Sequence, residues 1–175
     1  MWPEASGWTG RSHFLMKRSQ KGFSLIELLI VVAIILIIAA IAIPNLIKAR
    51  MQANEASAVA SIHALNTAEM SYSSAFPTIG FSATLANLGD GGTSPCPGSA
   101  TASCYIDPNL AAGTKSGYIF SYVADASTTP VLHYTINADP VSRGSSGTRS
   151  FYSSDSNVTR YNGLVVASSA DSALQ

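Results

Sequence analysis

Residues 21–44 read KGFSLIELLIVVAIILIIAAIAIP, a stretch that is apolar almost throughout and yet contains a carboxylate, Glu27, near its start. Among the 21 residues from Phe23 to Ile43, only Ser24 and Glu27 are polar. A helix of this length rises about 31 Å, which matches a bilayer hydrocarbon core of about 30 Å. The stretch therefore predicts a helix that can span a membrane.

The net charge differs on the two sides of this stretch. Residues 1–22 contain four basic residues and one acidic residue, a net charge of +3, whereas residues 23–175 contain six basic and nine acidic residues, a net charge of −3. Because positively charged flanks of membrane spans stay in the cytoplasm, the bulk of the chain is predicted to lie on the other side of the bilayer. A mildly acidic domain gives no support to a nucleic-acid partner.

The helix is predicted to continue beyond Pro44, where the missing backbone N–H predicts a bend or a weak point. Residues 45–76 contain neither Gly nor Pro. Apolar residues there recur at steps of three, four or seven and so share one helical stripe: Ile47, Met51, Ala58, Ile62, Leu65, Tyr72 and Phe76. Glu55 and Glu69 fall in the gaps of the stripe, and a carboxylate on a packing face needs a partner, which the sequence does not identify.

The chain after Pro77 is rich in turn residues and predicts a long connection followed by strands. One short helical turn is expected near Leu85, and the tail after Val166 is expected to be loose. Alternating patterns predict strands in four places: 118–125, 131–138, and, more weakly, 148–155 and 157–163. The predicted fold class is thus α+β, with a long N-terminal helix packed on a small C-terminal antiparallel sheet.

The two cysteines, Cys96 and Cys104, lie in the segment PCPGSATASC at 95–104. They lack the paired CxxC units and nearby histidines of a zinc site. Beyond the cytoplasm the oxidised pair is the favoured state, so the compartment, rather than any spacing rule, predicts a disulfide. Two free thiols remain the alternative.

Glu27 needs an explanation, because an ionised side chain within a membrane helix costs several kcal/mol and usually has a partner. The simpler reading is that Glu27 lies near the cytoplasmic end and snorkels to the headgroups. If the chain were cut between Gly22 and Phe23, however, the new α-amino group would lie at the same depth. It could then pair with the Glu27 carboxylate of a neighbouring chain.

Residues 22–27, GFSLIE, preceded by Lys21 and followed by an apolar run to Pro44, resemble the class III signal of type IV prepilins and related pseudopilins. The resemblance implies that a prepilin peptidase cuts after Gly22 and methylates the new amino group of Phe23. It also implies that Glu27 holds register during assembly, that Pro44 lies near a helix bend, and that the overall architecture is the pilin fold.

The resemblance divides the chain into a leader at 1–22, a transmembrane and assembly helix at 23–50, and a globular head at 51–175. The leader is long for the family, and Met16 offers a second start that would leave the short leader MKRSQKG. The family commonly closes a loop near the C-terminus with a disulfide, whereas Cys96 and Cys104 lie between the helix and the predicted sheet. Receptor-binding or subunit-contact roles of that family loop are therefore not transferred.

Other classes of function have less support in the sequence. A secretory signal peptide cleaved near Ala42 would leave Glu27 unexplained and would place Ile43 and Pro44 after the cut. For an enzyme, His63 lies on the predicted helix, and RGSSGT at 143–148 is not a G-x-S-x-G elbow. Acidic turns at 90–92 and 155–157 lack the ligand spacing of a calcium loop, so neither a metal nor another cofactor is predicted.

The sequence thus predicts a structural subunit of a type IV pilus, held in the bacterial inner membrane with its head in the periplasm and then assembled into a surface filament. The expected partners are other copies of the chain, the prepilin peptidase, the inner-membrane assembly machinery and, before assembly, membrane lipid. A type II secretion pseudopilin is the alternative. A minor pilin acting as a tip adhesin or DNA-binding module would require Arg143, Arg149 and Arg160 to form a basic surface.

Overall fold

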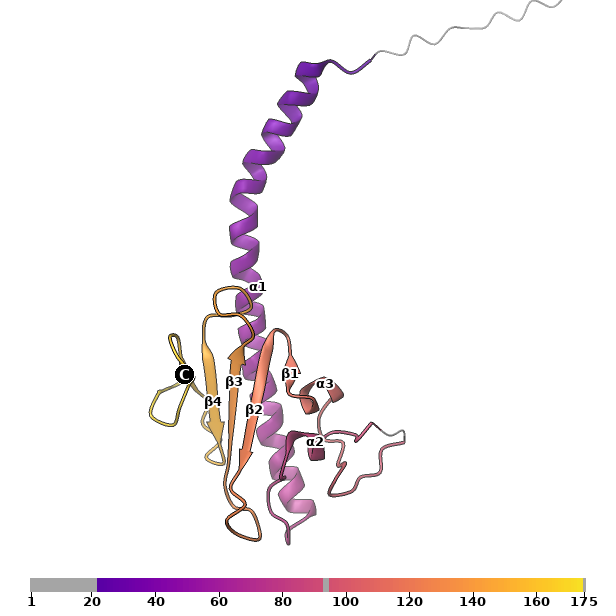
Figure 1. Ribbon diagram of the computed structural model, residues 1–175, viewed down its shortest axis with the longest axis vertical. Coiled ribbons are helices and arrows are strands. Elements are labelled where there is room, and N and C mark those ends of the chain that lie inside the picture. The colour runs from indigo at the N-terminus through magenta and orange to yellow at the C-terminus, as the bar shows by residue number, and fades with distance from the viewer. Residues whose placement is uncertain (1–21, 93–94, 175) are drawn as a thin grey trace, which may run out of the picture. The chain divides into compact units, whose positions relative to one another are not determined.

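The computed structural model describes residues 22–92 and 95–174. The chain divides into two compact units, Met1–Ala40 and Ile41–Gln175, and one helix, α1, contributes to both because it runs from Leu25 to Ala75. This is the α+β fold that the sequence predicts, a long apolar N-terminal helix together with a small antiparallel sheet (Figure 1). Met16 and nearly all of the predicted leader lie outside the described residues.

Helix α1 passes through Pro44 without an interruption in its helical assignment. A proline at this position leaves the carbonyl of residue 40 without its usual N–H donor. A bend at Pro44 stays a prediction.

The second unit contains a six-stranded antiparallel sheet in which every strand pairs with its neighbour in sequence, in the order β1-β2-β3-β4-β5-β6. Because neighbouring strands in the sheet are also consecutive in the sequence and antiparallel, each pair can be joined directly without a crossover connection. Its strands are β1 (Thr114–Lys115), β2 (Tyr118–Ala124), β3 (Tyr134–Pro140), β4 (Ser150–Ser154), β5 (Arg160–Asn162) and β6 (Ser172–Ala173). All four predicted strands therefore exist, with shifted ends, whereas β1 and β6 are new.

One face of the sheet packs on the second half of α1, as Figure 1 shows for β2, β3 and β4. Alternate residues of the central strands point into this core; in β3, for example, Tyr134, Ile136 and Ala138 are buried. The largest fully buried apolar side chains are Tyr72, Tyr118, Phe151, Ile62, Leu65, Leu88, Leu110 and Ile136. The stripe of α1 was predicted correctly from Ala58 onward, but Ile47 is 45% exposed and Met51 is half-buried, so the packing face begins later than the apolar pattern.

Both glutamates on the packing face of α1 are buried and hydrogen-bonded. Glu55 Oε1 accepts bonds from the backbone N–H and hydroxyl of Thr148, at 2.8 Å each, and Glu55 Oε2 accepts from Arg149 Nε at 2.8 Å. Glu69 Oε2 accepts from the backbone N–H of Ser82 at 2.9 Å, and its Oε1 accepts from the Ser82 hydroxyl at 2.5 Å. These are the partners that the sequence could not name.

Asn66 makes a third polar attachment between α1 and the rest of the head. Its side-chain amide donates to Ser153 Oγ at 2.9 Å and to Asn157 Oδ1 at 2.8 Å, and its oxygen accepts from the hydroxyl of Tyr134 at 3.0 Å. A buried amide can make several hydrogen bonds at once, so this one residue fixes α1 to β3, β4 and the turn after β4.

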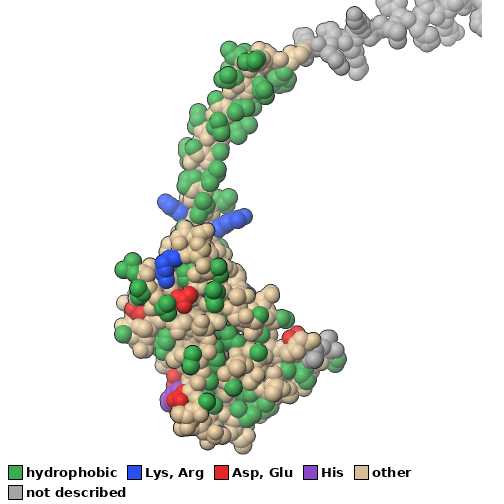
Figure 2. Space-filling model, viewed as in Figure 1, with side chains coloured by type: hydrophobic (Ala, Val, Ile, Leu, Met, Phe, Trp, Pro, Cys, Tyr) green, Lys and Arg blue, Asp and Glu red, His purple; other side chains and the backbone are tan. Residues whose placement is uncertain are grey.

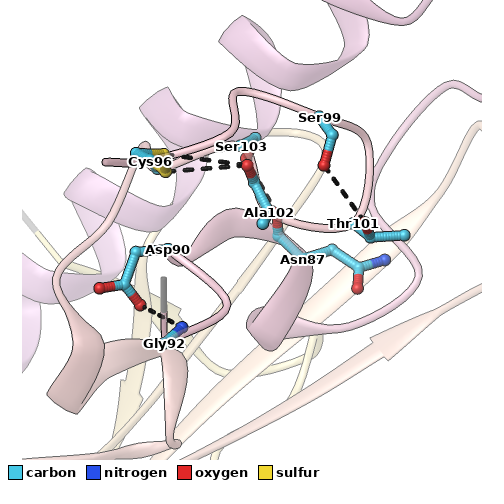
Figure 3. The surroundings of a disulfide bond; sticks show 9 residues. Asn87, Asp90, Gly92, Cys96, Ser99, Thr101, Ala102 and Ser103 are labelled. Carbon is cyan, nitrogen blue, oxygen red and sulfur yellow. Dashed lines mark hydrogen bonds between the residues drawn. A yellow bond between two sulfur atoms is a disulfide. The ribbon is translucent and has the colours of Figure 1, made fainter. Parts of the chain in front are cut away.

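The connection between α1 and the sheet contains two short helices, α2 (Leu85–Leu88) and α3 (Pro108–Ala111). The helical turn predicted near Leu85 is present. Cys96 and Cys104 form a disulfide in this connection, with their Cα atoms 6.4 Å apart (Figure 3). Backbone bonds from Cys104 N–H to the carbonyl of Gly89 and from Tyr105 N–H to the carbonyl of Leu88 hold the base of the loop independently of the sulfur bridge.

The prediction of a loose tail after Val166 is wrong. Ala167 is buried, and its carbonyl accepts from the Asn137 side chain at 2.6 Å. Further on, β6 pairs with β5, and the side chain of Asp171 accepts from Asn162 Nδ2 at 2.8 Å. The small polar residues of the tail have little apolar surface to bury, so hydrogen bonds order it instead.

We predict that Glu55 and Glu69 affect the pH dependence of stability in opposite directions. Burial raises the pKa of Glu69 above its ordinary value of 4.5, although bonds from Ser82 and Tyr122 act against the shift. Its contribution to the free energy of unfolding is therefore fully present below about pH 4.5 and declines as the pH rises through the raised pKa. Because Glu69→Gln stays neutral and keeps an acceptor oxygen, its stability relative to wild type should improve from pH 4.5 to pH 7.

Glu55→Gln provides the matched control. Burial also raises the pKa of Glu55, but the bonds from Thr148 and Arg149 outweigh it and leave the pKa lowered. The ionised Glu55 stabilises the fold above the unfolded pKa, and this stabilisation is lost as the pH falls through the lowered pKa. Glu55→Gln should therefore lose more unfolding free energy, relative to wild type, at pH 7 than at pH 4. Denaturant unfolding of the full chain in detergent at several pH values measures both effects. A Glu69→Gln deficit that grows toward pH 7 would contradict the assignment.

We predict that the disulfide stabilises the head without being needed for the fold. It closes a loop of nine residues from Cys96 to Cys104, which on the chain-entropy model contributes about 2–3 kcal/mol. The double variant Cys96→Ser, Cys104→Ser should lose that amount of unfolding free energy and keep its circular dichroism spectrum. Titration of two free thiols in the native, unreduced protein would show that the bridge is absent.

Candidate functional site

The first half of α1 has an apolar surface that no described residue covers. From residue 22 to residue 50 every residue is solvent-exposed except Ala39, which is half-buried. Figure 2 shows hydrophobic side chains along this part of the helix. An exposed apolar surface of this extent marks contact with a membrane or with other proteins. By length and composition α1 can cross a membrane, and it is the only such helix in the part of the chain that the structure describes.

Residues 22–24 precede the helix and have no regular secondary structure. The Ser24 carbonyl accepts the first bonds of α1, from the N–H groups of Glu27 at 3.1 Å and Leu28 at 3.2 Å. Phe23 is 79% exposed, and a Cβ added at Gly22 would meet no atom within 4 Å. The peptide bond between Gly22 and Phe23 therefore lies in an exposed, non-helical segment, the form in which a protease can bind a chain.

Glu27 lies in the first turn of α1 and is exposed. A carboxylate at a helix N-terminus is favoured by the helix dipole. No hydrogen bond or ion pair joins its side chain to any residue in 22–92 or 95–174. In an apolar environment its partner must therefore come from outside the described residues.

The three arginines that could form a basic surface on the head are instead used within it. Arg143 donates to the carbonyl of Thr148 and, at 2.6 Å, to Ser150 Oγ, and Arg160 donates to the carbonyl of Asp171 at 2.7 Å. Arg149 bonds Glu55 and lies over the rings of Phe151 and Tyr161, 5.6 Å from each centroid. This arrangement is that of structural arginines rather than of a nucleic-acid surface.

The residues considered for catalysis are not brought together. His63 is exposed on α1, and the RGSSGT segment forms a turn in which Gly144 N–H donates to the carbonyl of Gly147 at 2.8 Å. Within the described ranges, no group of three or more His, Cys, Asp or Glu side chains is placed to hold a metal ion. The polar groups that the structure does assemble hold α1 against the sheet.

The sequence analysis assigns no role to Lys48 and Arg50, which follow the apolar span. A signal was available, since two basic residues directly after an apolar span are typical of the bilayer surface. The link between Glu55 and Arg149 had no such signal, because these residues are 94 positions apart.

Comparison with known proteins gives matches to short segments. Residues 17–43 match the family model described as the prokaryotic N-terminal methylation motif. The chain is 66% identical over 38 residues to the type IV wide pilus major component PilA4 of Thermus thermophilus. This alignment covers 22% of the chain and 29% of that protein. The chain is also 54% identical over 52 residues to the type IV major pilin protein PilA of Myxococcus xanthus. This second alignment covers 30% of the chain and 24% of that protein.

These matches cover less than a third of either relative, and no solved structure matches the chain significantly. The family model nevertheless matches the same segment on which the sequence resemblance rests, since residues 17–43 include Gly22, Phe23 and Glu27. The resemblance of this chain to type IV pilins and their prepilin methylation motif is therefore confirmed.

Proposed function

We propose that this protein is a structural subunit of a type IV pilus, held in the inner membrane by α1 before assembly and joined to other copies by the same helix afterwards. The observation that carries the proposal is the exposed apolar half of α1, which begins at a prepilin-type motif. A membrane and a bundle of like helices are the two environments that can cover such a surface. The head, on the periplasmic side before assembly, becomes the outer part of the filament.

Processing is the first step of the proposed pathway. A prepilin peptidase cuts after Gly22 and methylates the amino group of Phe23, and the exposed, non-helical segment at 22–24 supports access to this bond. Glu27 then pairs with the amino terminus of an adjacent Phe23 in the assembling bundle. That pairing matches one positive with one negative charge in an apolar setting, where an unpaired charge is costly.

Two observations weigh on the alternatives. Both relatives are named as pilus components, which favours a pilus subunit over a secretion pseudopilin. The internal bonding of Arg143, Arg149 and Arg160 weighs against a DNA-binding tip subunit. The relatives are named as a major pilus component and a major pilin protein, which supports a structural rather than a catalytic role for this chain.

We predict that Gly22→Val blocks processing. A Cβ at residue 22 would meet no atom of the described residues within 4 Å, so the substitution should leave the fold unchanged and act on the fit of the scissile bond to the peptidase. Intact mass of the protein from cells should show uncleaved precursor, whereas Gly22→Ala, which adds a single methyl group, should be processed. A mature protein that begins at Ile43 would instead show cleavage of a secretory signal.

We predict that Glu27→Leu leaves membrane insertion and cleavage intact and abolishes filaments. Removing one member of a buried ion pair costs about 3–5 kcal/mol, because the Phe23 ammonium is left unmatched at every contact between copies. The variant is expressed as the only copy, its cleavage is confirmed by mass, and sheared filaments are weighed. Ser24→Ala removes the only other polar side chain of the span and should assemble normally. A normal filament yield from processed Glu27→Leu would show that Glu27 snorkels to the headgroups.

A further inference from the structure

Lys48 and Arg50 differ from the other basic residues that the structure describes. Four of the six make hydrogen bonds or ion pairs within the head: Lys115, Arg143, Arg149 and Arg160. Lys48 and Arg50 are exposed, and neither makes a hydrogen bond or an ion pair with residues 22–92 or 95–174. These two cations therefore interact with an external partner or with bulk solvent.

The acidic residue that lies close to Lys48 forms its ion pair with another residue. Lys48 and Glu55 line the same shallow hollow, together with Thr148 and Arg149. Both carboxylate oxygens of Glu55 already accept bonds from Thr148 and Arg149. Lys48 itself makes no ion pair with Glu55.

The position of the pair along α1 relates it to the membrane. Lys48 follows Glu27 by 21 positions, about the number of residues that a membrane-spanning helix needs, and Arg50 follows two positions later. With Glu27 at one edge of a hydrocarbon core of about 30 Å, both basic groups fall at the opposite headgroup layer. Their aliphatic stems can lie along the apolar helix while the charged ends reach the phosphates.

The direction of the two side chains identifies the kind of partner. Residues two positions apart on a helix point about 200° from each other, so Lys48 and Arg50 lie on opposite sides. Figure 2 shows Lys and Arg side chains standing out on both sides of the helix next to the head. A single free phosphate ion cannot contact both, whereas a layer of lipid headgroups surrounds the helix and meets each one.

We propose that Lys48 and Arg50 bind phosphate groups of anionic lipids at the head-side surface of the bilayer and thereby fix the depth of α1. The inference rests on the proposed insertion of α1 into a membrane. The planar guanidinium of Arg50 suits two oxygens of one phosphate, and the ammonium of Lys48 acts as a point charge. Release of this lipid contact accompanies each transfer of a subunit from the bilayer to the filament.

The test measures which lipids surround the protein. The full chain is reconstituted into phosphatidylcholine vesicles containing a minority of phosphatidylglycerol, and flotation first establishes insertion. Electron spin resonance then compares how strongly the protein immobilises spin-labelled phosphatidylglycerol and spin-labelled phosphatidylcholine. We expect wild type to favour phosphatidylglycerol about two- to fivefold, and Lys48→Gln, Arg50→Gln to lose about half of the excess, since the basic leader still contributes.

Lys115→Gln is the matched control, because it removes a charge whose partner, Asp107, lies in the head. It should keep the full preference. Inorganic phosphate should weaken the preference no more than chloride at equal ionic strength, and a specific loss with phosphate would overturn the lipid assignment in favour of a free-ion site.

Three other results would overturn the proposal. An unchanged preference in the double variant would show that the pair does not contact lipid. Equal immobilisation of both lipids by wild type, with filaments lost in the double variant, would assign the pair to contacts between copies. A chain that does not float with the vesicles would contradict membrane insertion itself, and this result is read before any lipid preference is measured.

Discussion

The apolar half of α1 sets the constraint on which the behaviour of this protein depends. Seventeen large hydrophobic side chains between Phe23 and Ile47 are at least 45% exposed. Burying a side chain of this kind is worth about 1.5–3 kcal/mol, so the total exceeds the net stability of about 5–15 kcal/mol of an ordinary domain. A chain with this surface cannot remain alone in water, and the rest of the structure has to be compatible with a membrane or with other copies.

The second half of the same helix solves a different problem. Among its buried polar residues, Glu55, Asn66 and Glu69 form side-chain hydrogen bonds with the rest of the head. Each side chain is bonded to a different part of the head: Glu55 to residues 148–149, Asn66 to β3, β4 and the following turn, and Glu69 to Ser82. Removing one partner would leave a buried polar group unsatisfied, so these bonds specify the position of α1 on the sheet as well as stabilising it.

The elements that depend on local pattern could be predicted from the sequence. The apolar run predicts the span, the alternation of Tyr134, Ile136 and Ala138 predicts β3, and Pro77 predicts the end of α1. Helix α3 was also within reach, because Asp107 accepts from the N–H of Leu110 as an N-cap and Pro108 opens the helix, both of which are start signals. The tail was misjudged because a sequence rich in Ser and Ala gives no sign of hydrogen bonds to distant strands.

Other features could not be predicted, because they depend on residues far apart in the chain or on other molecules. The partner of Glu55 is 94 positions away, and any of the arginines could have filled that place. The start of the packing face is a second case, because the apolar stripe includes Ile47 and Met51, yet Ile47 is exposed and Met51 is only half-buried.

An apolar helix by itself gives little reason to leave the bilayer for a bundle of identical helices. Lipid tails are as apolar as leucine, so helix association in a membrane depends on close packing and on polar groups rather than on the hydrophobic effect. In this chain the charged groups stand at the two ends of the span, Glu27 at one and Lys48 with Arg50 at the other. On the proposed function, Glu27 gains a partner on assembly while Lys48 and Arg50 give up lipid phosphates. The balance between these exchanges, rather than the apolar run between the two charged ends, then decides whether a subunit stays in the membrane or joins the filament.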